Sequence, residues 1–177
     1  MRADRQAPLP PDIRPLRDTD PEWISAAFAA IGWSRPRQLY DRYLAAREVA
    51  HRDVWVALLG ERFAGYVTLN WRPTYAPFQA ERIPEIQDLN VLPAYRRLGI
   101  GTALLDIAES RAGDSAAVVG IAVGLSSDYG SAQRLYVARG YRPDGRGIAY
   151  DYRTLRHGER TVVDDNLVLC FTKSLRK

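Results

Sequence analysis

Two arginines and two glycines lie close together near the middle of the chain, where a helix is expected to begin. Arg96 and Arg97 come first, and Gly99 and Gly101 follow. Glycine lets the backbone approach a phosphate closely, and the free N–H groups and dipole of a helix start attract negative charge. An arginine guanidinium adds a bidentate contact to phosphate oxygens. The run therefore predicts a pyrophosphate site, and an ordinary turn with two solvated arginines is the alternative.

Two common phosphate-binding patterns do not fit this run. The Walker pattern needs a lysine, and the only lysines stand at the C-terminal end, from position 173 onward. The dinucleotide pattern G-x-G-x-x-G/A needs a third glycine or alanine where this chain has Leu104. The pattern that remains is Arg96-x-x-Gly99-x-Gly101, placed after an expected strand that ends in valine.

The composition limits the number of domains and the kinds of partner. A chain of 177 residues has the usual size of one domain, and 46% hydrophobic and 26% charged residues are typical of a globular protein. The 25 basic and 21 acidic residues give a net charge of +4, which favours an anionic ligand of unspecified kind. The arginines are spread along the chain rather than gathered in a stripe, so we expect no nucleic-acid partner.

The sequence also limits metal binding, membrane binding and the location of the protein in the cell. The single Cys170, with His51 and His157 as the only histidines, excludes the common zinc clusters, and we expect no metal. No apolar run approaches the roughly 18 residues of a membrane span, so we expect no membrane partner. The polar, proline-rich residues 1–11 contain no apolar signal core, which favours a cytoplasmic protein.

The elements that precede the run follow from apolar periodicity and from turn residues. Asp20 is the expected N-cap of a helix with Pro21 at its first position. Tyr40, Tyr43 and Leu44 lie on one face of a second helix. The expected elements are a strand over 12–17, helices over 21–31 and from Pro36, a β-hairpin formed by 54–59 and 62–71, and a proline-rich loop over 72–84.

The segment 85–91 is expected to be the strand that leads into the glycine turn. Its apolar positions switch parity between Ile86 and Leu89, which indicates either a β-bulge or a strand buried on both faces. A helix is expected from the glycine turn to Gly113, and a buried strand over 117–125 follows it. Strand, turn, helix and strand then form a βαβ unit with parallel strands.

One more helix and a last strand complete the expected fold. Ala132, Leu135 and Tyr136 lie on one face of a short helix that Gly140 closes. The apolar residues of 166–175 predict the last strand. The order of the elements predicts a mixed sheet with helices on both faces.

Two runs carry a resemblance to a known family. The run LNVLPAYRRLGIGTALL resembles the coenzyme A pyrophosphate motif of the GNAT superfamily of N-acetyltransferases, R/Q-x-x-G-x-G/A, and Arg96, Gly99 and Gly101 fit it. The later run AQRLYVARGY, residues 132–141, is similar to the family segment A-x-x-L-Y-x-x-x-G-F/Y, and the order and spacing of the two runs also fit. The resemblance is strongest over residues 85–141.

This resemblance implies a fold, a domain and a reaction. The fold is α/β (α+β), a mixed and mostly antiparallel twisted sheet of about six to seven strands with a central parallel βαβ unit and helices on both faces (the GNAT fold). The polar segment 1–11 precedes a single N-acetyltransferase domain over 12–177. The reaction is transfer of an acetyl group from acetyl-CoA, as cosubstrate, to a primary amine that attacks the thioester directly.

The residues that would bind acetyl-CoA are also implied by the resemblance. In the family, the fourth strand carries a bulge and splays from the fifth, and acetyl-CoA lies in the opening. The backbone of Leu89, Asn90 and Val91 would hold the pantetheine arm, and one N–H would polarise the thioester carbonyl. Tyr129 stands where many members carry asparagine, and Ser131 would replace part of that contact. The implied pyrophosphate residues are Arg96, Arg97, Leu98, Gly99, Ile100, Gly101 and Thr102.

Tyr136 and Glu85 are the implied catalytic residues. Tyr136 aligns with a family tyrosine near the thioester sulfur and would act as general acid, because a phenol with a pKa near 10 is protonated at neutral pH. A core tyrosine is the alternative. Glu85 aligns with a glutamate that is the base in histone-modifying members, and it would act through a water. Asp88 is the second candidate for the base, water alone is a third, and a solvated edge glutamate is the plain alternative.

The acetyl acceptor is the least specified part. We expect a small-molecule or peptide amine, and homodimers are frequent in the family. Aromatic rings and carboxylates suit a cationic amine. A non-catalytic sensor that binds coenzyme A is the alternative to an enzyme, and a nucleic-acid-binding domain is suggested by charge alone. The candidate acceptor residues are Trp33, Trp71, Tyr75, Phe78, Glu81, Tyr150, Asp151 and Tyr152.

Overall fold

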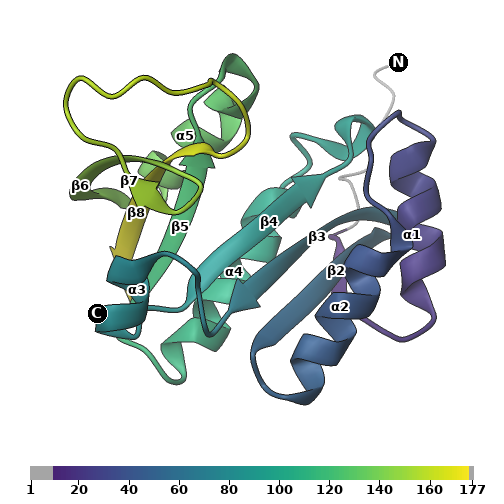
Figure 1. Cartoon of the computed structure of the whole chain (residues 1–177). Coiled ribbons are helices and arrows are strands. Elements are labelled where there is room, and N and C mark those ends of the chain that lie inside the picture. The colour runs from purple at the N-terminus through teal and green to yellow at the C-terminus, as the bar shows by residue number, and fades with distance from the viewer. Residues whose placement is uncertain (1–9, 176–177) are drawn as a thin grey trace, which may run out of the picture. The chain divides into compact units, whose positions relative to one another are not determined.

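The structure is a computed structural model in which residues 10–175 are described (Figure 1). In chain order the elements are β1 (Asp12–Pro15), α1 (Asp20–Ala29), α2 (Arg37–Glu48), β2 (Arg52–Leu59), β3 (Arg62–Asn70), α3 (Ala76–Glu81), β4 (Glu85–Val91), the 3-10 turn η1 (Pro93–Tyr95), α4 (Ile100–Gly113), β5 (Val118–Gly124), the 3-10 turn η2 (Ser127–Tyr129), α5 (Gly130–Ala138), β6 (Arg142–Tyr150), β7 (Arg153–Thr154) and β8 (Leu167–Ser174).

The strands form a mixed sheet. Their order is β1-β2-β3-β4-β5-β8-β6-β7. Strands β4 and β5 are parallel, with Glu85 opposite Gly120 and Ile86 opposite Ile121, as the predicted βαβ unit requires. Four other neighbouring pairs, β1/β2, β5/β8, β8/β6 and β6/β7, are antiparallel. The predicted fold class is therefore confirmed. The described residues give an 8-stranded sheet rather than six or seven strands, because β7 is a separate strand of only 2 residues.

The described residues divide into two compact units, each with its own cluster of buried apolar side chains. The first unit contains the residues up to Thr68 and the segment Asp88–Ile107. The second contains Leu69–Gln87 and the residues from Ala108 onward. Strands β3 and β4 and helix α4 each begin in one unit and end in the other.

In the first unit, α1 and α2 pack together, and α2 also packs on β2. Helix α2 buries Tyr40 and Tyr43 of its predicted apolar face, and α1 buries Ile24 and Phe28. The ring of Phe28 meets the ring of Tyr66 edge to face, with centroids 5.9 Å apart. The buried residues of this core are Leu16, Ile24, Phe28, Tyr40, Tyr43, Val54, Val56, Leu58, Phe63, Tyr66 and Leu92.

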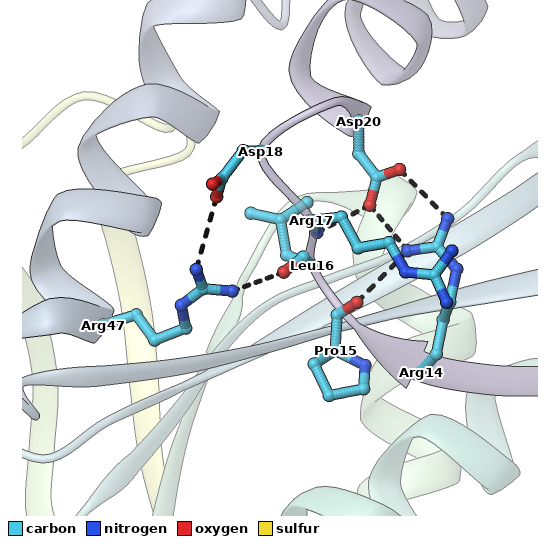
Figure 2. Close-up of polar contacts among 7 residues, drawn as sticks. All are labelled: Arg14, Pro15, Leu16, Arg17, Asp18, Asp20 and Arg47. Atoms are coloured by element: carbon cyan, nitrogen blue, oxygen red, sulfur yellow. Dashed lines mark hydrogen bonds and ion pairs between the residues drawn. The ribbon is translucent and has the colours of Figure 1, made fainter.

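The start of α1 differs from the sequence-based expectation. Asp20 is the first residue of the helix rather than its N-cap, and Thr19 occupies the cap position without a side-chain hydrogen bond. The Asp20 carboxylate instead accepts hydrogen bonds from both Nη atoms of Arg14, at 2.6 and 3.0 Å, and from the Arg17 N–H at 2.8 Å (Figure 2). An ion pair with the preceding strand β1 thus takes the carboxylate that would otherwise cap the helix.

A second pair of charges lies beside this ion pair. One Nη of Arg47, on α2, donates to the carbonyl of Leu16 at 2.5 Å, and the other lies 3.3 Å from the Asp18 carboxylate (Figure 2). The Asp18 side chain is 85% exposed, whereas that of Asp20 is 5% exposed. The two aspartates therefore offer a comparison between an exposed and a buried ion pair on the same loop.

In the second unit, the segment 72–84 is not simply a loop, because it contains the short helix α3. Proline is tolerated in the first turn of a helix, and Pro77 stands there. The helix buries Phe78, whose ring lies against Gly120 of β5. A Cβ at Gly120 would lie 2.3 Å from the Phe78 ring, so the small residue on β5 is what admits the helix.

Strands β6 and β7 had no sequence signal of their own. Most residues of β6 are exposed, so the strand lacks the alternation of apolar and polar side chains on which prediction depends. Its pairing with β8 shifts register between Pro143 and Ile148, and Gly145 and Gly147 both have positive φ there. The irregular backbone explains why glycine is frequent in a segment that is nevertheless a strand.

A buried carboxylate anchors the end of β8 in this unit. Glu109 of α4 accepts hydrogen bonds from Arg139 at 2.8 Å, from Lys173 at 2.6 Å and from the Tyr141 hydroxyl at 3.0 Å. Burial opposes the charged form of Glu109, but the hydrogen bonds from Arg139 and Lys173 outweigh burial and lower its pKa. This cluster has a structural role in the second unit.

The two aspartates of the α1 loop give a first prediction. Asp20→Ala leaves the Arg14 guanidinium buried without its partner, and we expect it to lower the free energy of unfolding by about 2–3 kcal/mol. Asp18→Ala removes an exposed contact and should cost less than about 0.5 kcal/mol. Urea unfolding of the two variants and the parent chain measures both values. Equal losses for the two variants would contradict the assignment of Asp20 as the anchor of α1.

Candidate functional site

Strand β4 contains one residue with a left-handed backbone, at the place where the apolar positions switch parity. Asp88 has φ 52°, which is unusual for a residue inside a strand. Its carboxylate accepts a hydrogen bond from the Tyr43 hydroxyl of α2, and its carbonyl accepts one from the Asn90 side chain at 3.0 Å. This left-handed residue interrupts the regular alternation of side chains between Ile86 and Leu89.

After Asp88, the strand lies close against β3 within the first unit. The N–H of Leu92 donates to the carbonyl of Ala64 at 2.9 Å. A Cβ at Gly65 would lie 2.4 Å from the Asn90 carbonyl oxygen and 3.2 Å from the Val91 Cα. Only glycine at position 65 therefore permits this approach. Leu89, Asn90 and Val91, the predicted pantetheine residues, are all half-buried.

The predicted pyrophosphate run forms a tight turn between η1 and helix α4. Arg97 has φ 62° and Gly99 has φ 80°, so the chain adopts a left-handed conformation twice before the helix starts. The N–H of Ala103 donates to the Gly99 carbonyl at 3.0 Å. The N–H groups of the three preceding residues, 100–102, come before the first helical bond, so the helix itself supplies no acceptor for them. N–H groups at a helix start are suited to binding an anion.

The two arginines of this turn differ in their surroundings. Arg96, Arg97 and Leu98 are all exposed. The Nε of Arg96 donates to the carbonyl of Val91 at 3.3 Å, and its guanidinium lies 5.6 Å from the centre of the Trp33 ring. Arg96 is therefore held at the end of β4. Trp33, predicted as an acceptor residue, lies beside this arginine, and its ring stacks on that of Phe28 with the centroids 5.9 Å apart.

Tyr136 lies in the second unit, on the face of α5 that the periodicity predicted. It is 5% exposed, and its ring lies 5.9 Å from the ring of Tyr141. Burial raises the pKa of Tyr136, and the nearby Tyr129 adds to the effect. The phenol is therefore protonated at neutral pH, which both the catalytic and the core interpretation of this residue require.

Tyr129, which directly precedes α5, and Gln133 within α5 both contact Gly124 at the end of β5. The Tyr129 hydroxyl bonds to Asp165 at 2.9 Å, and its ring covers Gly124, where a Cβ would lie 2.4 Å from the ring. The Gln133 side chain donates to the Gly124 carbonyl at 2.8 Å. Ser131 is exposed. Tyr129 thus has a structural role beside the end of β5.

Glu85 is buried rather than solvated at an edge. It is 2% exposed, and its carboxylate accepts a hydrogen bond from the Gln87 side chain at 2.8 Å. Burial raises the pKa of the Cys170 thiol to about 12, and the negative charges of Glu85 and Asp144 contribute to this rise. Asp88, the second candidate for the base, is exposed and bonded to Tyr43.

Most candidate acceptor residues of the second unit make structural contacts. The Tyr75 hydroxyl bonds to Asp144 at 2.9 Å, and burial raises the pKa of Tyr75 to about 12. Phe78 is part of the core, as described above. The remaining contacts are Trp71 beside the Arg111 guanidinium at 4.9 Å, Glu81 with Arg146 at 2.5 Å, and Tyr150 with Asp164 at 2.9 Å. Asp151 and Tyr152 are exposed and have positive φ.

Three polar groups that the sequence did not single out are buried in the first unit. The Nε of Arg35 makes no hydrogen bond to any described residue, and the buried hydroxyls of Tyr40 and Tyr66 face each other. Tyr40 was expected only as a core residue. A tyrosine inside an otherwise apolar strand, as at position 66, is the one signal that could have indicated this cluster.

No group of three or more histidine, cysteine, aspartate or glutamate side chains within residues 10–175 could hold a metal ion. None of the helices described there is long and apolar enough to cross a membrane.

Comparison with known proteins identifies the family. The sequence model of the acetyltransferase (GNAT) family matches residues 17–141. The chain therefore belongs to the GNAT acetyltransferase family, and it is an acyltransferase. The match includes β4, the glycine turn and α5, the segments in which the two motifs lie. No curated protein matched the sequence significantly.

Solved structures support the same fold at low sequence identity. A GNAT-family protein from Desulfovibrio desulfuricans superposes with a TM-score of 0.69 at 15% identity, over 94% of this chain and 100% of that chain. An acetyl-CoA-bound GNAT acetyltransferase from Elizabethkingia anophelis gives 0.61 at 19% identity, over 93% and 97%. The ribosomal-protein-S18-alanine N-acetyltransferase from Escherichia coli gives 0.66 at 15% identity, over 95% and 96%.

Replacing Gly99 and Gly130 by alanine should change the stability of the fold in opposite directions. Gly99→Ala places a side chain at φ 80° and should destabilise the fold by about 1–2 kcal/mol, although nothing lies within 4 Å of the added Cβ. Gly130 has φ −56°, and its added Cβ also meets nothing within 4 Å, so Gly130→Ala should stabilise by about 0.5 kcal/mol. Thermal unfolding measures both changes. A stable Gly99→Ala protein would contradict the left-handed turn.

Proposed function

We propose that the protein is an N-acetyltransferase that moves the acetyl group of acetyl-CoA to a primary amine of a small molecule or a peptide. The observation that carries the proposal is the left-handed turn between β4 and α4. It presents helix-start N–H groups beside two exposed arginines, at the position of the family's pyrophosphate motif. The acetyl-CoA found in the Elizabethkingia anophelis relative adds support for this cosubstrate.

We assign the binding of acetyl-CoA to consecutive parts of this segment. The backbone of Leu89, Asn90 and Val91 would pair with the pantetheine arm, after the left-handed Asp88 has ended regular strand geometry. The N–H groups of 100–102 and the side chains of Arg96 and Arg97 would receive the pyrophosphate, for which helix-start dipoles and guanidinium groups are suited. Leu98 and Ser131 would make flanking contacts.

The proposed reaction is a direct displacement. The neutral amine forms a C–N bond to the thioester carbon, and an N–H of the β4 segment stabilises the oxyanion of the tetrahedral intermediate. The C–S bond then breaks, the amine proton leaves to a base, and coenzyme A departs with its sulfur protonated or hydrogen-bonded. Holding amine and thioester together supplies much of the rate enhancement.

Tyr136 is assigned the role of acid at the sulfur. Burial raises its pKa above the ordinary value near 10, and a free thiol has a pKa near 8.5. A phenol that is the weaker acid does not protonate a thiolate completely at equilibrium. Its main contribution would then be a strong hydrogen bond to the departing sulfur while the C–S bond breaks.

Glu85 is assigned the role of base through a water. Its carboxylate is 2% exposed and is oriented by the Gln87 side chain. A buried, oriented carboxylate can hold one water in a fixed position and pass the amine proton through it. Asp88 is the second candidate, but its carboxylate is already bonded to the Tyr43 hydroxyl.

An acceptor screen tests the proposed function. Amines are offered together with acetyl-CoA, and release of the coenzyme A thiol reports acetyl transfer.

The variant Tyr136→Phe tests the proposed acid. We expect Tyr136→Phe to lower kcat by about tenfold to a hundredfold with little change in the KM for acetyl-CoA. Tyr141→Phe, which removes a buried hydroxyl bonded to Glu109, should lower thermal stability but leave kcat within about twofold. Unchanged turnover in Tyr136→Phe would exclude its role at the sulfur.

The base is tested by the pH dependence of kcat/KM. Glu85→Gln should lower kcat/KM by about a hundredfold at neutral pH and remove the acidic limb of the profile, because a carboxamide cannot accept the proton. Glu22→Gln changes an exposed glutamate of α1 and should leave the profile unaltered. An acidic limb that persists in Glu85→Gln would assign the base to another group or to water.

A further inference from the structure

Asp88 is the one described residue other than glycine that has a left-handed backbone inside a strand. An L-residue is disfavoured in this conformation because its Cβ crowds the following carbonyl oxygen. A backbone of this kind persists where the surrounding structure holds it. The other non-glycine residues of 10–175 with positive φ all lie between elements, and they are Ala50, Arg82, Arg97, Asp151 and Tyr152.

The side chain of Asp88 is held by Tyr43 of helix α2. The Tyr43 hydroxyl donates a hydrogen bond to the Asp88 carboxylate. Tyr43 is 7% exposed, its ring meets that of Tyr40 edge to face at 6.1 Å, and the Arg52 guanidinium lies 4.9 Å from the ring centre. Burial and the charge of Asp88 raise the pKa of Tyr43, so its hydroxyl stays protonated and remains a donor. A donor fixed by packing therefore meets an exposed carboxylate.

The segment that follows Asp88 is attached to β3 at its other end. The N–H of Leu92 donates to the Ala64 carbonyl at 2.9 Å. The Asn90 side chain donates to the carbonyl of Asp88 at 3.0 Å. Residues 89–91 thus run between two fixed points, the left-handed residue and the bond to β3. A rotation of φ at Asp88 to an extended value would turn the peptide groups of 89–91.

We propose that Tyr43 is a positioning residue for acetyl-CoA. Its bond to the Asp88 carboxylate keeps the backbone of Asp88 left-handed. That conformation directs the N–H and C=O groups of 89–91, which we assign to the pantetheine arm. Tyr43 acts on the cosubstrate through Asp88 and not by touching it. This inference rests on the proposed function and adds to it a residue that lies outside both sequence motifs.

The variant Tyr43→Phe removes the hydroxyl and keeps the ring in the core. The dissociation constant of acetyl-CoA should rise about fivefold or more, because one hydrogen bond that holds the segment is lost. Tyr40→Phe is the matched control on the same helix. It removes a buried hydroxyl that faces Tyr66, and it should change the dissociation constant less than about twofold. Isothermal titration calorimetry measures both values, and an unchanged value in Tyr43→Phe would overturn the inference.

NMR of the protein without acetyl-CoA reports the backbone at position 88 directly. The backbone chemical shifts and the three-bond N–H to Hα coupling of residue 88 depend on its φ. Both should indicate a left-handed residue in the parent chain and in Tyr40→Phe. In Tyr43→Phe they should move toward extended values. A core role of the Tyr43 ring would leave these signals in place, so a left-handed residue 88 in Tyr43→Phe would contradict the proposal.

Glycine at position 88 tests whether Tyr43 acts through Asp88. Glycine adopts positive φ readily, so Asp88→Gly permits the conformation without the bond to Tyr43. In the Asp88→Gly background, Tyr43→Phe should change the dissociation constant of acetyl-CoA less than about twofold. Asp88→Ala, which has neither the carboxylate nor the freedom of glycine, should bind acetyl-CoA about fivefold more weakly than Asp88→Gly. Binding is measured because Asp88 is also the second candidate for the base.

The double-variant comparison separates this inference from the proposed function. An equal loss of affinity from Tyr43→Phe in the two backgrounds would show that the hydroxyl does not act through Asp88, and it would overturn the inference. Equal dissociation constants for Asp88→Ala and Asp88→Gly would do the same, even if Tyr43→Phe fails to fold. In both cases the proposed function would stand. A parent chain that does not bind acetyl-CoA would instead contradict the proposed function.

Discussion

The hydrogen bond from the Tyr43 hydroxyl to the Asp88 carboxylate fixes the residue on which the geometry of β4 depends. An L-residue with φ 52° is disfavoured inside a strand, although aspartate adopts this conformation more readily than most residues. The bond from α2 and the Asn90 side chain both support it. Without the left-handed residue, β4 would keep regular alternation through Leu89–Val91. The segment that we propose to bind the cosubstrate therefore begins at a conformation that a hydrogen bond from α2 maintains.

The same constraint extends along the chain to the glycine turn. Gly65 allows β4 to lie close to β3, and Arg96 is bonded back to the carbonyl of Val91. Two left-handed residues, Arg97 and Gly99, then direct the backbone into α4 with its first N–H groups unpaired by helical bonds. Positive charge in this family member comes from arginine alone at this place, because the chain has no lysine before position 173. The anion site that we propose here therefore rests on local backbone geometry rather than on net charge.

The sequence predicted the elements whose apolar residues recur with a regular period. It did not predict the elements that depend on a single tertiary contact. The faces of α1, α2 and α5, the β2–β3 hairpin and the parallel pair of β4 and β5 follow from apolar spacing. Helix α3 depends on Phe78 meeting Gly120, and β6 is mostly exposed, so neither leaves a periodic signal. Asp20 looked like a cap but pairs with Arg14. The residues of the glycine turn were predictable because their spacing is the motif, whereas Arg35 and Tyr66 are distant in sequence and meet only in the fold.

Amide exchange measured with and without acetyl-CoA tests the central claim most directly, namely that the end of β4 and the start of α4 bind the cosubstrate through their backbone. Hydrogen–deuterium exchange, followed by NMR at single amides, resolves these N–H groups individually. The account predicts the largest slowing on addition of acetyl-CoA at residues 89–91 and 97–102. Slowing confined to other segments, with exchange at these N–H groups unchanged at saturating acetyl-CoA, would contradict it.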